Sequence, residues 1–149
     1  MIEVARVADQ RELEQALELR RAVFVGEQGV SPAAEQDGRD FEGVHLVARE
    51  RGRVVGTCRL LLAPPVDRRG RPEVRLGRLA VGPAWRRRGV ASALLAAAER
   101  EARAAGAQRI VLHAQTYACA LYLDAGYRRR GRPFLEEGIE HVTMERPLG

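Results

Sequence analysis

Seven segments of the chain have the alternation or composition of β-strands. They cover residues 2–8, 44–50, 54–62, 74–81, 109–114, 127–130 and 139–146. Residues 2–8 alternate apolar with polar positions, whereas 109–114 are mainly apolar and β-branched, as in a buried strand. The spacing and composition of residues 51–53 predict a hairpin between the second and third segments. A loop that contains Pro133 and Gly138 is predicted between the last two segments.

Apolar residues repeat at helical spacing in three other segments. These segments cover residues 9–24, 90–102 and 116–125. Asp9 followed by Glu12 resembles a capping box, which predicts that the first helix begins there. Between residues 26 and 43 the periodicity stops, so we expect a loop with one short helix after Ser31 and Pro32. Strands and helices together predict one mixed α/β domain over residues 1–149.

The segment 74–81 follows a polar connection at 63–72 and does not keep a strict alternation. Its first two apolar residues share a face and its last two share a face, but the pairs are out of phase by one position. The pairs are Val74 with Leu76 and Leu79 with Val81. One extra residue at a glycine is typical of a β-bulge, which predicts a bulge near Gly77 and Arg78. The alternative is that Arg78 extends its side chain from a core face to solvent.

Length and composition exclude several classes of protein. A chain of 149 residues with 46% hydrophobic and 30% charged residues has the size and composition of one globular domain. Its apolar runs are shorter than the ~20 residues of a membrane span, and its first residues lack the pattern of a signal peptide. Cys58 and Cys119 lie in different predicted elements without a metal-binding spacing. We therefore expect reduced thiols, a cytoplasmic protein, no membrane contact and no metal.

All 25 basic residues are arginines, and the formal net charge is +5. A biased genome composition explains such arginine usage more simply than function does. Three clusters, at 68–71, 86–88 and 128–132, would nevertheless attract phosphates of a nucleic acid or of a nucleotide cofactor. A small basic nucleic-acid-binding protein would interleave arginines with aromatic residues. Aromatic residues make up only 5% of the chain, and few of them border a cluster, so we expect no nucleic-acid partner.

The most specific stretch is the turn that follows the segment 74–81 and leads directly into a helix. The free N–H groups and the partial positive charge of a helix N-terminus stabilise an anion. Gly89 permits close backbone approach, Ala91 leaves room, and the arginines at 86–88 add positive charge. This pattern predicts a diphosphate site, against the alternative of a solvated arginine cluster. Neither a Gly-Lys-Ser/Thr sequence nor the glycine spacing of a dinucleotide fingerprint accompanies it.

Arg86-x-x-Gly89-x-Ala91, placed after a bulged strand, resembles the Gln/Arg-x-x-Gly-x-Gly/Ala signature of the GNAT family of N-acetyltransferases. Tyr122, followed by the pair Gly126–Tyr127, resembles the family's next helix. The resemblance covers essentially the whole chain. The chain resembles the ElaA-like subgroup of the family more closely still. The segments that carry this closer likeness are 23–28, Asp37–Gly38 with Asp40, His45, Ala114–Gln115, and 134–141 with Met144.

This resemblance implies an α/β (α+β) fold with a strongly curved mixed sheet and helices on both faces. The strands at 74–81 and 109–114 would splay apart to admit acetyl-coenzyme A (acetyl-CoA), the implied cosubstrate. The pantetheine arm would pair with backbone groups of Leu79, Ala80 and Val81, and the diphosphate would bind Arg86, Arg87, Arg88, Gly89, Val90, Ala91 and Ser92. Gln115 stands where many members carry asparagine and would also contact the cofactor, as would Tyr122.

The implied reaction is direct attack of a primary amine on the thioester in a ternary complex. Tyr122 would donate a proton to the leaving thiolate, unless it is only a core aromatic residue. The general base stays open, because Arg75 occupies the position where several family members carry a glutamate. Glu73, acting through water, and His45 are candidates, and a water chain to bulk solvent is equally compatible. Further candidates, for each of which a structural role is the alternative, are Glu27, Glu35, Asp37, Asp40 and His141.

The acceptor would be a small-molecule or peptide amine between the loops at 26–43 and 133–141. Its expected contacts are Glu27, Gln28, Asp37, Asp40 and His141. Both loops are rich in Asp and Glu, which would favour a cationic amine. The main alternative from another class is the small basic nucleic-acid-binding protein. A sensor that binds acetyl-CoA without turnover is a third possibility and shares every cofactor contact. Dimers are common in the family, so a homodimer is an open expectation, although the sequence does not require one.

Overall fold

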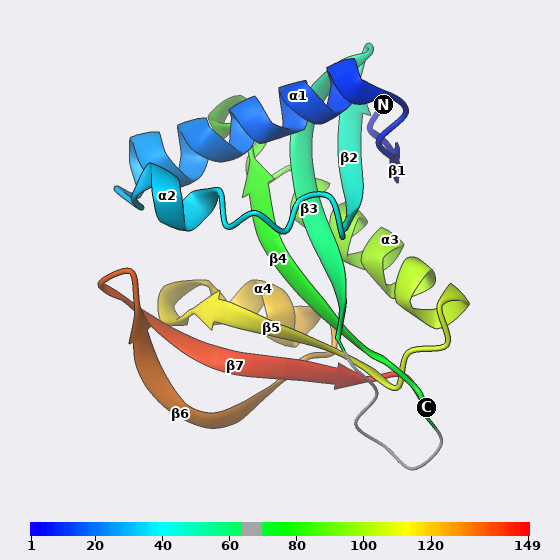
Figure 1. The fold of residues 1–149 in the computed structure, drawn as a ribbon, viewed down its shortest axis with the longest axis vertical. Helices are drawn as coiled ribbons and strands as arrows, with labels where there is room; N and C mark the ends of the chain where they lie inside the picture. The colour runs from blue at the N-terminus through cyan, green and yellow to red at the C-terminus, as the bar shows by residue number, and fades with distance from the viewer. Residues whose placement is uncertain (64–69) are drawn as a thin grey trace.

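The computed structural model describes residues 1–63 and 70–149, so most of the connection expected at 63–72 lies outside the described residues. Seven strands in this part of the chain form one sheet, in the order β1-β2-β3-β4-β5-β7-β6 (Figure 1). The strands are β1 (Glu3–Arg6), β2 (Val44–Glu50), β3 (Arg53–Ala63), β4 (Glu73–Val81), β5 (Arg109–Gln115), β6 (Arg128–Glu136) and β7 (Ile139–Pro147). Only β4 and β5 are parallel neighbours among them. The α+β class and the mixed sheet are confirmed.

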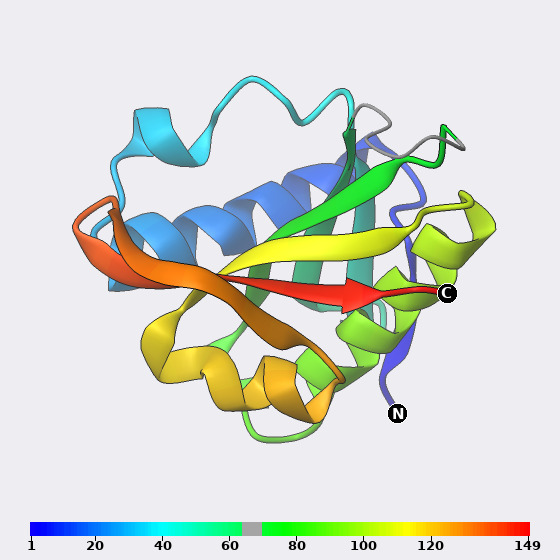
Figure 2. The same ribbon diagram turned by 90° about the horizontal axis from the view of Figure 1, so that it is seen from below.

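Helices cover both faces of the sheet (Figure 2). They are α1 (Gln10–Arg20), the π-helix η1 (Arg21–Glu27), α2 (Pro32–Glu35), the 3₁₀ turns η2 (Pro83–Trp85) and η3 (Thr116–Ala118), α3 (Val90–Ala104) and α4 (Cys119–Asp124). α1 and α2 lie on one face, and α3 and α4 lie on the other.

The caps expected from the sequence form. The Asp9 side chain accepts a hydrogen bond from Glu12 N at 2.8 Å, and Glu12 Oε1 accepts one from Ala8 N at 2.8 Å. Ser31 Oγ accepts a hydrogen bond from Ala34 N at 3.1 Å, which starts the short α2. The expected loop begins later than Gly26, because η1 continues the first helix to Glu27.

The main core lies between the sheet and α3. Ile110 and Leu112 of β5 are buried in one cluster with Leu94 and Ala98 of α3. Gly56 of β3 allows the helix to approach closely, because a Cβ atom there would lie 2.8 Å from a methyl group of Val90. Burying side chains of the size of leucine contributes roughly 1.5–3 kcal/mol each, so this contact fixes the start of α3 against the sheet.

The last two strands differ from expectation. β6 continues through Pro133 to Glu136 instead of ending at Arg130. Its register against β7 shifts between Arg130 and Phe134. A proline without an N–H group is tolerated there because β6 is the edge strand. The loop is reduced to a two-residue turn at Glu137 and Gly138, both of which have positive φ, as in a tight hairpin.

β4 is irregular at its centre and leaves β5 early. Thr57 of β3 is opposite Ala80, but Arg59 is opposite Gly77, so β4 uses one residue more than β3 over this stretch. Arg78 lies there with φ of 55°. β4 and β5 are paired only over Glu73–Arg75 and Arg109–Val111. Beyond these pairs the two strands run in different directions (Figure 1).

Gly56→Ala should destabilise the protein by about 1–3 kcal/mol, because the added methyl group overlaps Val90 and overpacks the core. Denaturant unfolding at neutral pH measures this difference. Gly26→Ala is the matched control, since its Cβ atom would lie 3.9 Å from the nearest atom, Arg21 O. Equal stability of the two variants would contradict the close approach of α3 to β3.

Candidate active site

A cavity of about 770 Å³ joins the turn before α3 to the β6–β7 hairpin. Arg86, Ala91 and Tyr122 contribute to one part of its lining, and Glu136 and His141 contribute to another. Residues of β4 and β5 lie between these parts, on either side of the place where the strands separate. The cavity therefore extends along the edge of β4 that β5 leaves unpaired.

The turn before α3 leaves backbone N–H groups available. Gly89 is the N-cap residue with φ of 80°, and no side chain caps this helix in the described residues. The first backbone hydrogen bond of the helix is donated by Ala93 N to Gly89 O at 3.0 Å. The amides of Val90, Ala91 and Ser92 precede it and have no partner within the helix. A Cβ atom at Gly89 would meet nothing within 4 Å, so the turn has open space beside it.

Contacts of Trp85 and Arg86 hold this turn against the sheet and the π-helix η1. Trp85 Nε1 donates a hydrogen bond to Glu50, and the Arg53 guanidinium lies 5.0 Å from the centre of the Trp85 ring. Arg86 donates to Val81 O at 3.0 Å and forms an ion pair with Glu27 at 2.8 Å. Glu27, expected to contact the acceptor, is thus paired with a residue expected to contact the diphosphate.

The residues expected along the cofactor lie on three elements. Leu79 and Val81 of β4 line the cavity, whereas the Ala80 side chain is buried in the core. Gln115 of β5 also lines it and donates a hydrogen bond to Gln28 Oε1 at 2.7 Å. Tyr122 of α4 lines the same cavity, and its burial raises the pKa of its phenol to about 12.

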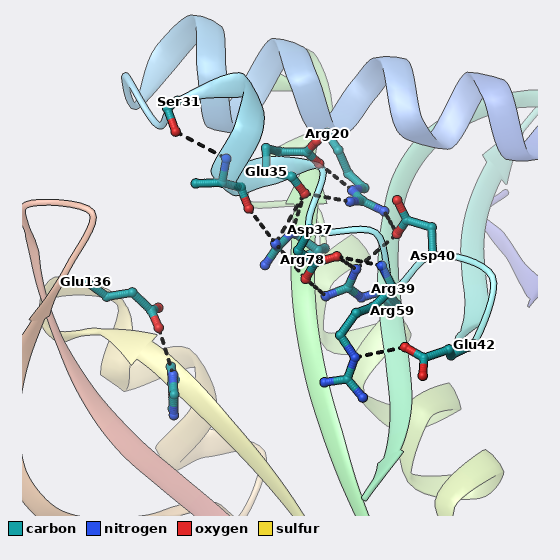
Figure 3. A network of polar contacts seen from close by, with 12 residues as sticks. Arg20, Ser31, Glu35, Asp37, Arg39, Asp40, Glu42, Arg59, Arg78 and Glu136 are labelled. Atoms are coloured by element: carbon teal, nitrogen blue, oxygen red, sulfur yellow. Dashed lines mark hydrogen bonds and ion pairs between the residues drawn. The ribbon is translucent and has the colours of Figure 1, made fainter.

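Three arginines and three carboxylates form an ionic network (Figure 3), and four of the six line the cavity. They are Arg20, Arg59, Arg78, Glu35, Asp37 and Asp40. Arg20 and Glu35 are both buried and lie 2.6 Å apart. Arg59 donates two hydrogen bonds to Asp37, at 2.8 and 2.9 Å. These bonds from the Arg59 guanidinium hold the pKa of Asp37 far below its usual range.

Arg78 connects this network to the irregular part of β4. Its guanidinium donates to the carbonyl oxygens of Ala34 at 3.1 Å and Glu35 at 3.2 Å, at the end of α2. It also lies 3.2 Å from Asp37 Oδ2. The side chain does not extend to solvent from a core face; it holds the segment after α2 over β4.

The network corrects the expectation of an acidic cavity entrance at 26–43. Asp40 is bonded to Arg20 at 2.8 Å and to Arg59 at 3.0 Å. Burial alone would raise the pKa of Asp40, but these two guanidinium groups outweigh burial and lower it. With Glu27 also paired, the carboxylates of this segment are matched by arginines. Counting charges along the sequence could not show this pairing, because the partners are far apart in the chain.

The expected bases occupy different environments. His45 does not line the cavity; it is buried, and its Nε2 donates to Asp40 O at 2.9 Å. Glu73 is buried but lines the cavity, 3.9 Å from the Arg109 guanidinium. His141 lines the cavity and donates from Nδ1 to Ile139 O at 2.7 Å. His45 thus lies apart from the other two.

One histidine in the cavity was missed by the sequence analysis. His113 of β5 lines it, with Nδ1 3.1 Å from Glu136 Oε1. The alternation of β5 could have identified it from the sequence, because Ile110 and Leu112 are buried in the core and His113 is on the opposite face. In residues 1–63 and 70–149, no three His, Cys, Asp or Glu side chains are grouped as metal ligands.

This fold, with its open helix N-terminus and long cavity, is that of an acyl-CoA N-acyltransferase, and comparison with known proteins agrees. Residues 9–148 match the family described as the acetyltransferase (GNAT) domain, and the chain belongs to this family. It is 33% identical over 137 residues to YjcF of Bacillus subtilis (strain 168), which is described as an uncharacterized N-acetyltransferase. That alignment covers 91% of this chain and 93% of YjcF.

Two solved structures are also similar. An acyl-CoA N-acyltransferase from Pseudomonas aeruginosa has a TM-score of 0.80 and 30% identity, covering 98% of this chain and 99% of the other. ElaA of Escherichia coli has a TM-score of 0.82 and 25% identity, with the same coverage. The expected family is confirmed, and the likeness to ElaA fits the expected subgroup. None of the described helices is long and apolar enough to cross a membrane.

The free energy of unfolding should fall as the pH decreases below about 4, the ordinary range of an aspartate pKa. The pKa of Asp37 is lowered in the folded state, so its stabilising bonds are complete above that range and are lost as the folded carboxylate becomes protonated. Asp37→Asn should be less stable at pH 7 by roughly 1–3 kcal/mol and should lose less stability on acidification. Denaturant unfolding between pH 7 and pH 2 measures both effects.

Glu42→Gln is the control, because Glu42 pairs with Arg39 at the surface with 60% of its side chain exposed. Its stability should follow that of the unchanged protein at every pH. If Asp37→Asn gave the same curve as Glu42→Gln, the network would not stabilise the segment after α2.

Proposed function

We propose that this chain is a single-domain N-acetyltransferase, over residues 1–149, that transfers the acetyl group of acetyl-CoA to a primary amine of a small molecule or peptide. The observation that carries the proposal is the uncapped N-terminus of α3 at a cavity that continues along the unpaired edge of β4. The cavity thus adjoins both the N–H groups at the start of α3, which could bind a diphosphate, and the edge of β4, which could pair with an extended amide chain. Acetyl-CoA requires both.

The diphosphate would bind the amides of Val90, Ala91 and Ser92, with positive charge from Arg87 and Arg88 and close approach at Gly89. An anion gains stabilisation from the helix N-terminus and from these arginines. Arg86 would act from the cavity wall, since it is held by Val81 O and Glu27.

The pantetheine arm would enter where β4 separates from β5. The backbone of Leu79, Ala80 and Val81 would pair with its amides, and the Gln115 side chain would contact it from the other strand. The extra residue of β4 near Arg78 would act as a bulge that turns N–H groups toward the thioester. Such an N–H group stabilises the oxyanion that forms when the amine attacks.

In the proposed reaction, the amine nitrogen attacks the thioester carbon, the C–N bond forms and the C–S bond breaks. Tyr122 would face the leaving sulfur. A phenol with a pKa of about 12 is a weaker acid than a thiol with a pKa of about 8.5. Tyr122 would therefore stabilise the thiolate by a hydrogen bond instead of giving up its proton.

The acceptor amine would lie between the segment after α2 and the β6–β7 hairpin. Gln28, Asp37 and His141 line this part of the cavity. Asp40 would act indirectly, because it is bonded to Arg20 and Arg59. The experiment that tests the function measures free CoA released from acetyl-CoA with a panel of amines. Binding of acetyl-CoA with no release of CoA for any amine would contradict the proposal and favour a sensor.

Ala91→Glu should weaken acetyl-CoA binding by about tenfold or more, which corresponds to roughly 1.4 kcal/mol, because it puts a carboxylate beside the diphosphate. Protein stability should not fall, since a glutamate in the first turn of a helix is favourable. Isothermal titration calorimetry with acetyl-CoA measures the affinity. Ala96→Glu, on an exposed position of the same helix, is the control and should bind normally. Equal acetyl-CoA affinity of both variants would contradict a diphosphate site at this turn.

Tyr122→Phe should lower kcat by roughly tenfold to a hundredfold, because the thiolate loses its hydrogen-bond donor. Acetyl-CoA affinity should change little, since the ring remains. Steady-state kinetics with calorimetry separates the two effects. Tyr127→Phe is the control: its hydroxyl is buried without a partner in the described structure, and its ring lies 6.0 Å from that of Tyr122. An unchanged kcat for Tyr122→Phe would remove this residue from the mechanism.

A further inference from the structure

β4 and β5 separate at a defined position on the cavity face. Their last pair is Arg75 with Val111. The next residues on the same face of each strand are Gly77 and His113, and both line the cavity. His113 is therefore placed across the opening from the irregular part of β4.

The space beside Gly77 is not filled by the protein. A Cβ atom at this residue would meet nothing within 4 Å, and its φ is not positive. Neither packing nor backbone conformation requires a glycine here. Open space at the fork between two strands is where a thioester and an attacking amine could meet, and His113 borders it.

The His113 ring is held in one orientation. Its Nδ1 lies 3.1 Å from Glu136 Oε1, and its ring meets Phe134 edge to face at 4.9 Å between centres. An ionised carboxylate only accepts hydrogen bonds, so Nδ1 carries the proton in this bond. The lone pair of the neutral ring is then on Nε2, as in a histidine base oriented by a carboxylate.

The other groups in reach are less suitable as bases. Asp37 is bonded to Arg59 and Arg78. Glu73 lies beside the Arg109 guanidinium. His141 is nearly buried, and its Nε2 faces Glu136 Oε2 at 3.7 Å. His113 has 45% of its side chain exposed, so substrate and solvent can reach it.

We infer that His113 is the general base of the reaction and that Glu136 is its positioning residue. This inference rests on the proposed function. The ammonium group of the acceptor gives one proton to His113 Nε2. The amine lone pair then forms the C–N bond as the C–S bond breaks. The second proton of the nitrogen passes to the leaving sulfur beside Tyr122, so the products are the neutral amide and the CoA thiol. The histidine later returns the proton to solvent, so charge and atoms balance.

Several charged and titratable groups face His113 from the surrounding elements. Those that line the same cavity on the strands and turn around it are Arg75 from β4, Arg130 and Glu136 from β6, Glu137 from the turn and His141 from β7, and Glu136 contacts the His113 ring directly. Arg130 is paired with Glu145 at 3.1 Å. Because His141 also faces Glu136, the pH profile of a His141→Gln variant has to be measured beside that of His113.

The experiment measures kcat/KM for an active amine between pH 5.5 and pH 9.5. His113→Gln should lower kcat/KM by about a hundredfold at pH 7 and remove the fall of the rate toward acid pH. Its acetyl-CoA affinity should stay within about twofold, since His113 is outside the proposed cofactor contacts. His113→Ala should regain activity when free imidazole is added, because the cavity is open at this residue.

Glu136→Gln should shift the acid limb and lower kcat, whereas Glu136→Asp should restore part of the activity. Glu18→Gln, an exposed carboxylate on α1, is the control and should behave as the unchanged protein. A pH profile of His113→Gln that keeps its acid limb would overturn the inference, as would a His113→Ala variant that imidazole does not rescue. An acid limb lost only in His141→Gln would assign the base to His141. Absence of amine-dependent turnover in the unchanged protein would instead contradict the proposed function.

Discussion

β4 and β5 are joined by three residue pairs and then separate, and the arrangement of the site depends on this separation. Parallel neighbours that stay paired would satisfy each other's N–H and C=O groups along their whole length. Because β5 leaves, the second half of β4 keeps an edge inside the protein. The turn that follows β4 then brings the N-terminus of α3 to the same cavity, so one strand positions both groups that acetyl-CoA would require.

The ionic network holds the segment after α2, here called the covering segment, against β4. Arg78 lies where β4 has its extra residue and donates to the end of α2, so the irregular strand and the covering segment are held as one unit. Arg20 and Glu35 are buried together, and loss of Arg20 would be costly because the buried Glu35 carboxylate would lose this partner. The covering segment is thus anchored by charge pairs instead of by an apolar core.

Local signals in the sequence predicted most elements and the turn that is proposed to bind the cofactor. The caps at Asp9 and Ser31 and the pattern from Arg86 to Ala91 depend on residues close together in the chain. The pairing of Arg59 with Asp37 depends on the fold, since 22 positions separate them, and it corrected the expectation of an acidic entrance for residues 26–43. Pro133 was interpreted as a loop residue because an edge position cannot be recognised before the strand order is known.

The most direct test of the account follows backbone amides of the ¹⁵N-labelled protein by NMR while acetyl-CoA is added. Binding at the turn and along β4 predicts that the largest shifts occur at Gly89, Val90, Ala91 and Ser92 and at Leu79 and Val81. The amides of β1 and β2, which lie at the other edge of the sheet, should stay in place. Shifts confined to other elements, or no shifts at saturating acetyl-CoA, would contradict the account.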